Sequence, residues 1–174
     1  MAAPCYITWS GIVPTTATTS PYGTVQSAIA SQSTAGQPKT ILQIATGKKI
    51  RVVEWGYLLS SAPTGPVQME LLDTNTVAAT AGTIGTVLNY NDTSASTSSA
   101  LVATTSQTGY GFTGEGAATA NVRLLAQTYD LSTYFKQQFP LGREPEVAAS
   151  CFLRVRVTPT SAAVSLLAYC IWEE

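Results

Sequence analysis

The chain has 174 residues and a formal net charge of −1, and only 11% of its residues are charged. An average globular domain carries roughly 25% charged residues. A net charge near zero excludes the excess of Lys and Arg by which nucleic-acid-binding proteins contact phosphates. The sequence contains no His, which excludes mechanisms that need an imidazole as base, proton shuttle or metal ligand. No apolar run approaches the ~18 residues of a membrane span, so neither nucleic acid nor a membrane is an expected partner.

The first 38 residues differ in composition from the rest of the chain. Tyr6 and Trp9 lie near the start, whereas residues 13–37 are mostly Thr, Ser, Ala, Gly and Pro. A segment with so few large apolar side chains buries too little surface to offset its ordering entropy. The composition predicts an extended N-terminal arm over residues 1–38, which docks on a partner through Tyr6 and Trp9. An irregular terminus without a docking role is the alternative.

From residue 39 onward, the pattern predicts strands separated by turns. Residues 50–60 are apolar on both faces beyond Arg51, which indicates a central strand covered on both sides. In residues 67–71, apolar and polar side chains alternate, as in a half-buried strand. The remaining predicted strands are 40–45, 83–88, 100–104, 121–131, 134–139, 151–158 and 164–172. This series predicts an all-β fold, a jelly-roll-like antiparallel β-sandwich that occupies residues 39–174.

The last two predicted strands are expected to form a hairpin. In both strands every second residue is apolar, and residues 158–163 form the turn between them. If Val157 lies opposite Val164, antiparallel pairing places these apolar residues on one face. The same register places Cys151 opposite Cys170. We expect both thiols to be reduced, because the chain lacks the features of a secretion signal and is expected to stay in a reducing compartment.

Few residues are candidates for catalysis. Glu144 and Glu146 could act as the carboxylate pair of a glycoside hydrolase, but Pro145 between them extends the segment and directs their side chains apart. Glu54 lies in an apolar strand and needs a partner, for which an Arg on a neighbouring strand or subunit is expected. The three Cys residues lack the spacing of a metal site. The sequence therefore predicts no catalytic residue, no cofactor and no metal.

Five short runs carry a family resemblance. In chain order they are IRVVEWGY (50–57), PVQMELLDT (66–74), PLGREPEV (140–147), LRVRVTP (153–159) and AYCIWEE (168–174). Their order, together with the GREPEV loop, resembles a group of small structural proteins encoded in the head gene region of tailed phages that infect actinobacteria. The resemblance covers residues 39–174 and leaves the first 38 residues without support.

The resemblance implies a capsid decoration, or cement, protein. Such proteins are β-rich and often trimeric, and they bind the major capsid protein on the outside of the mature shell. A structural virion protein on the capsid exterior, assembled in the host cytoplasm and without enzymatic activity, is therefore expected. The candidate partner-binding residues are Tyr6, Trp9, Arg143, Glu144 and Glu146.

Two other functions stay open at this point. The first is a tail, baseplate or head-fibre module that binds glycans, for which Tyr90, Tyr110 and Phe112 are the candidate residues because they lie in polar predicted loops. The same aromatic side chains can instead fill the core. The second is a glycosidase that uses Glu144 and Glu146.

Overall fold

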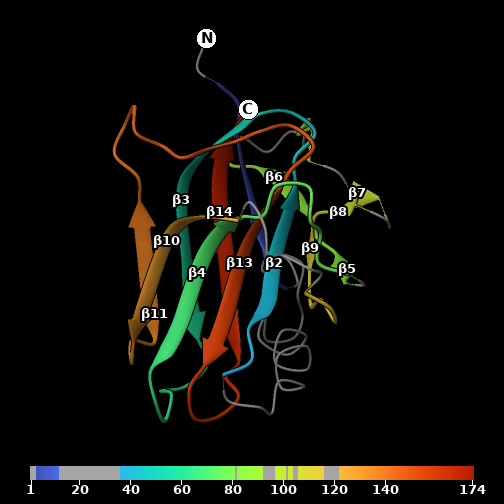
Figure 1. Ribbon diagram of the computed structural model, residues 1–174. Helices are drawn as coiled ribbons and strands as arrows, with labels where there is room; N and C mark the ends of the chain where they lie inside the picture. The colour runs from blue at the N-terminus through green and yellow to red at the C-terminus, as the bar shows by residue number, and fades with distance from the viewer. Residues whose placement is uncertain are drawn as a thin grey trace.

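The computed structural model describes residues 3–11, 36–80, 82–91, 97–100, 102–103, 106–115 and 122–174. These residues form strands and no helix, and two antiparallel sheets pack against each other (Figure 1). The predicted all-β antiparallel sandwich is thereby confirmed, whereas its jelly-roll connectivity stays a prediction. None of the described residues belongs to a helix with the length and apolarity of a membrane span.

We name the two large sheets A and B. Sheet A has the order β11-β3-β14-β1-β6, and β12 also pairs with β3. Its strands are β11 (Tyr134–Gln138), β3 (Ile50–Leu59), β14 (Leu166–Glu173), β1 (Cys5–Trp9), β6 (Val87–Asn89) and β12 (Glu146–Val147). Sheet B has the order β10-β4-β13-β2-β9-β5. Its strands are β10 (Arg123–Asp130), β4 (Val67–Asp73), β13 (Phe152–Pro159), β2 (Lys39–Ala45), β9 (Gly109–Tyr110) and β5 (Thr83–Ile84). The short strands β7 (Val102–Ala103) and β8 (Ser106–Gln107) pair separately.

The predicted hairpin of the last two strands is wrong. β13 pairs with β2 and β4 in sheet B, whereas β14 pairs with β1 and β3 in sheet A. Cys170 lies opposite Trp55 and Thr8, not opposite Cys151. The apolar faces of β13 and β14 meet across the core instead of lying side by side in one sheet. The alternation of apolar residues is the same in both arrangements, so it could not distinguish them.

The N-terminal residues that the structure describes contribute a strand to sheet A. β1 pairs with β14 on one side and with β6 on the other. Tyr6 is therefore buried, with its ring 6.0 Å from that of Trp172 and its hydroxyl 3.0 Å from the Thr97 hydroxyl. Residues 12–35 of the predicted arm lie outside the described residues, so the arm itself stays a prediction.

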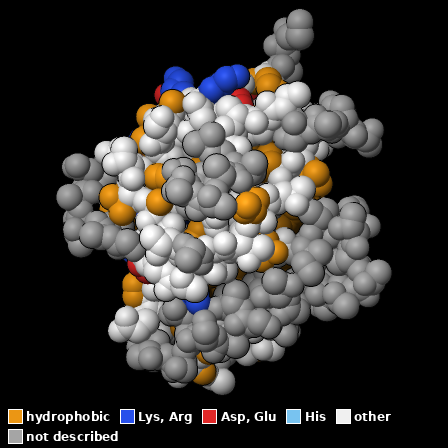
Figure 2. All heavy atoms as spheres, turned by 90° about the vertical axis from the view of Figure 1, so that its right-hand side faces the viewer, with side chains coloured by type: hydrophobic (Ala, Val, Ile, Leu, Met, Phe, Trp, Pro, Cys, Tyr) orange, Lys and Arg blue, Asp and Glu red, His pale blue; other side chains and the backbone are white. Residues whose placement is uncertain are grey.

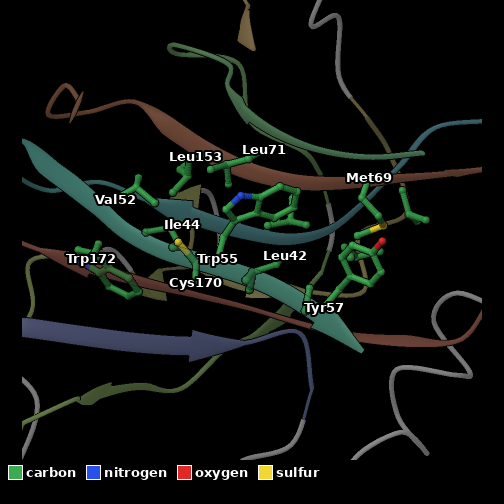
Figure 3. Packing of buried hydrophobic residues seen from close by; sticks show 14 of the residues in the cluster. Leu42, Ile44, Val52, Trp55, Tyr57, Met69, Leu71, Leu153, Cys170 and Trp172 are labelled. Carbon is green, nitrogen blue, oxygen red and sulfur yellow. The ribbon is translucent and has the colours of Figure 1, made fainter. Parts of the chain in front are cut away.

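The core lies between the two sheets, and Trp55 of β3 is near its centre (Figure 3). The Trp55 side chain is fully buried and points from sheet A towards Leu71 and Leu153 of sheet B. Its ring packs edge-on against Phe135, with 5.3 Å between the ring centres, and its indole Nε1 donates a hydrogen bond to Gln137. Residues 50–60 were expected to be central, and β3 does lie between β11 and β14.

On the outer face of sheet A, Glu54 has partners other than the expected Arg. Its carboxylate lies 3.0 Å from the ammonium group of Lys136 and accepts a 2.7 Å hydrogen bond from the Tyr169 hydroxyl. The Tyr169 ring lies across Gly56, where an added Cβ would be only 2.7 Å from the ring. Burial, followed by the hydrogen bond to Glu54, raises the pKa of Tyr169. Glu54 thus contributes to a structural contact between β3, β11 and β14.

The three thiols differ in accessibility, and this predicts their reactivity. Each is free in the structure; Cys5 is partly exposed, whereas Cys170 is completely buried. Burial raises the pKa of all three thiols, but Cys151 and Cys170 are both buried, so Cys5 is the residue most accessible to a reagent. We expect a thiol reagent at pH 8 to label Cys5 in the folded protein and to label Cys170 only after unfolding in urea. Labelling of a Cys5→Ser variant at the wild-type initial rate would contradict this assignment.

Candidate interaction surface

Exposed large apolar side chains are concentrated on one side of the sandwich. Eight such side chains are exposed among the described residues, and six of them lie on β10, on β11, at the adjacent end of β3 or in the loops that flank β11. These six are Leu58, Leu124, Tyr129, Leu131, Tyr134 and Leu141. We call them the β10–β11 patch. The other two, Ile84 and Tyr90, lie near β5 and β6.

The chain path explains why these residues gather. β10 is the edge strand of sheet B, β11 is the edge strand of sheet A, and only residues 131–133 connect them (Figure 1, left). Tyr134 and Leu58 are cross-strand neighbours on the outer face of sheet A. The Tyr57 hydroxyl lies 3.3 Å from the hydroxyl of Thr128 and so connects β3 to β10 across the edge. Sequence reasoning missed the patch, because alternation identifies a strand without showing which edge stays uncovered.

Figure 2 shows the opposite side of the molecule, over β5 and β9. The described hydrophobic side chains form separate spots there among uncharged polar atoms, and charged side chains gather at the end where the two termini lie. Isolated exposed apolar residues are normal on a soluble protein, whereas a concentration of them indicates a contact surface.

Both edge strands on the β10–β11 side carry features that discourage a further strand from adding to the sheet. The ammonium group of Lys136 lies at the middle of β11, and a register irregularity interrupts the pairing of β10 with β4 at Leu125. A charge or a bulge on an edge strand makes strand addition unfavourable. A partner at this side is therefore expected to contact the side chains rather than the open backbone.

The predicted site residues Arg143, Glu144 and Glu146 lie in the segment that follows β11. Glu146 lies at the start of β12 and forms an exposed ion pair of 3.1 Å with Lys49. The pKa of Glu144 is lowered because its carboxylate accepts hydrogen bonds from its own backbone N–H and from that of Gly142, and because Arg51 is close. The guanidinium group of Arg143 has no hydrogen bond or ion pair with any described residue. The two acids are thus engaged within the chain, and the cation faces solvent.

The remaining predicted residues lie elsewhere. Tyr6 is in the core, and Trp9 is half-buried opposite Tyr169, so the structure does not bring them together with Arg143 and Glu146. Two of the three candidate glycan-binding aromatics, Tyr110 and Phe112, are 7% and 0% exposed and therefore fill the interior.

The described residues also offer little chemistry. They contain no group of three or more acidic or Cys side chains that could hold a metal ion. A hollow between residues 60–65 and 161–165 is lined by small and hydroxyl-bearing side chains and holds no titratable group. This hollow can contact a ligand by shape and hydrogen bonding, but its lining supplies no acid or base.

The chain matches no protein-family model, no curated protein and no solved structure. Among the described residues, the β10–β11 patch and the segment after β11 are the features that most resemble a binding surface.

Proposed function

We propose that the protein is a structural virion component that binds the outside of a phage capsid and stabilises the shell. In this proposal it acts as a homo-oligomer, with a trimer as the expected state, and its main partner is the major capsid protein. Its role is adhesion, so it requires no catalytic centre and no cofactor.

The observation that carries the proposal is the concentration of exposed apolar residues on the β10–β11 side. Tyr129, Leu131 and Tyr134 are each more than half exposed on a well-packed sandwich. Aromatic and large aliphatic side chains contribute most of the free energy of protein–protein contacts when a partner excludes water from them. The low charge of the chain removes much of the desolvation penalty of such contacts. The family resemblance of the five sequence runs suggests the capsid as the partner.

Co-sedimentation tests the proposal. Purified protein is mixed at micromolar concentration with mature capsids that lack it, and the pelleted fraction is measured. We expect the wild type to pellet when it is mixed with capsids and to stay in the supernatant when it is mixed with unassembled coat protein. The double variant Y129D/Y134D should bind at least about tenfold more weakly, because two charges would have to be desolvated at the contact. The variant Ile84→Asp, on the opposite side, is the matched control and should bind like the wild type.

Two results would contradict the proposal. Absence of the wild type from the capsid pellet at micromolar concentration would remove the capsid as partner. Equal binding by the wild type and the double variant would show that Tyr129 and Tyr134 do not contact the capsid, which removes the observation that carries the proposal. Sedimentation analysis of the free protein measures its oligomeric state, and a monomer at all concentrations would contradict the trimer.

A further inference from the structure

Leu141 is the most exposed large apolar side chain among the described residues. It is 97% exposed, whereas the other members of the β10–β11 patch range from 38% to 63%. Leu141 lies at the second position of a tight turn in which the Arg143 N–H donates a 2.9 Å hydrogen bond to the Pro140 carbonyl. Gly142 has a φ of 78°, which identifies a type II turn and explains why glycine occupies the third position. The turn projects beyond the end of β11 (Figure 1, orange trace at the upper left).

The turn is held in place at its base. The N–H of Phe139 bonds to the Val53 carbonyl, and the N–H of Val52 bonds to the Pro145 carbonyl, both at 2.9 Å. These two contacts hold both ends of the turn segment to adjacent residues of β3. Immediately after the turn, β12 pairs with the start of β3, and Val147 is fully buried. The position of Leu141 is therefore largely fixed before binding, which lowers the entropy cost of using it as an anchor.

The charged side chains beside Leu141 differ in whether they already have a partner within the chain. Glu144 is bound to the backbone of the turn and lies near Arg51, and Glu146 is paired with Lys49. Arg143 is the one charged side chain of residues 139–147 without such a contact among the described residues. The tip of the turn thus presents an apolar knob next to an available guanidinium group. A complementary surface would combine an apolar pocket with a carboxylate at its rim.

We propose that Leu141 and Arg143 form the anchor by which the protein docks on the capsid, with Leu141 inserted into an apolar pocket and Arg143 paired with a carboxylate beside it. The inference rests on the proposed function, and it names the part of the surface that recognises the shell protein. The residues Tyr129, Leu131 and Tyr134 lie around residues 131–133, at the opposite end of β11 from the turn, and extend the contact.

The experiment compares two pairs of variants in the capsid co-sedimentation assay. Leu141→Asp is matched with Ile84→Asp, which places the same charge on an exposed apolar position of the other side. Arg143→Glu is matched with Lys48→Glu, which makes the same charge change at another exposed cation. We expect each turn variant to weaken capsid binding about tenfold or more, because anchor residues of interfaces commonly contribute this much. The two control variants should stay within about threefold of the wild type, the scale of neutral surface changes.

Conservative variants and the salt response refine the test. Leu141→Met should retain most of the binding because it keeps an apolar side chain of similar volume. Binding by the wild type should weaken with added salt more than binding by Arg143→Ala, because the variant lacks the proposed ion pair. Circular dichroism should show that all variants are folded, since both turn side chains are exposed.

The outcomes separate this inference from the proposed function. If the wild type binds capsids and both turn variants bind equally well, the inference is overturned while the capsid remains the partner. If the wild type does not bind capsids, both are overturned. If Leu141→Asp instead changes the oligomeric state of the free protein, then the turn contacts a sister copy and the capsid anchor is refuted. Selective loss of capsid binding in the two turn variants, with an unchanged oligomeric state, supports the inference.

Discussion

Replacement of Trp55 by Ala is expected to lower the free energy of unfolding by about 3–5 kcal/mol, the cost of removing a large aromatic side chain from a packed core. The indole is fully buried between the sheets and contacts Phe135, so its removal leaves a cavity that neighbouring side chains cannot fill. The loss also leaves the Gln137 side chain without its hydrogen-bond donor. Because domains of this size are stable by roughly 5–15 kcal/mol, the variant should be close to unfolding at 37 °C.

Urea unfolding followed by far-ultraviolet circular dichroism measures this effect without relying on tryptophan fluorescence. Trp55→Phe should be less destabilised than Trp55→Ala, because it retains an aromatic ring in the cavity. Tyr129→Ala, at a position that is 63% exposed, is the matched control and should change the free energy of unfolding by less than about 0.5 kcal/mol. Equal losses in Trp55→Ala and Tyr129→Ala would refute the central role of Trp55.

Replacement of Glu115 by Ala is expected to cost about 3 kcal/mol, the lower end of the range for removing one partner of a buried ion pair. Arg154 is 1% exposed on the outer face of sheet B, and burial lowers its pKa. Its Nη1 lies 3.8 Å from the Glu115 carboxylate and donates a 2.8 Å hydrogen bond to the Glu115 carbonyl. The same carboxylate accepts hydrogen bonds from the backbone N–H and, at 2.8 Å, from the hydroxyl of Thr40. Its loss would leave a buried guanidinium without a counter-charge.

A double-mutant cycle distinguishes this electrostatic cause from a simple loss of contacts. Arg154→Met combined with Glu115→Ala should be less destabilising than the sum of the two single changes by about 1 kcal/mol or more, as for other directly interacting pairs. Lys49→Ala, which removes an exposed ion pair with Glu146, should cost no more than about 1 kcal/mol. Strictly additive single effects would show that Arg154 and Glu115 are not coupled.

The sequence predicted individual strands better than their pairing. Residues 67–71 alternate apolar and polar side chains, and they form most of β4, because a strand with one face in the core leaves this signature. The partners of a strand depend on contacts between distant residues, which a local pattern does not contain. For β13 and β14, the apolar alternation was recognised and the pairing was wrong, since a sandwich core and a shared sheet face demand the same pattern.

The candidate surface was less predictable than the fold. Glu144 and Glu146 were considered first as a carboxylate pair and then, with Arg143, as partner-binding residues. The structure instead engages the two acids with Arg51 and Lys49, which precede them by about ninety residues in sequence. Leu141 was not singled out, because a turn signal such as Gly142 does not show which neighbouring side chain stays exposed. The Glu174 carboxylate accepts hydrogen bonds from Ser98 and Ser99, which are distant in sequence, so no local pattern indicates this contact.

The position of β1 between β14 and β6 has a consequence for how the protein reaches its native state on the ribosome. Tyr6 must pair with Trp172, so β1 has to wait for a partner strand that is synthesised much later. Strands β2, β4 and β10 of the other sheet are available well before then, but sheet A cannot close until β14 has left the exit tunnel. Pairings between such distant segments form slowly, so sheet A is expected to be completed late in folding.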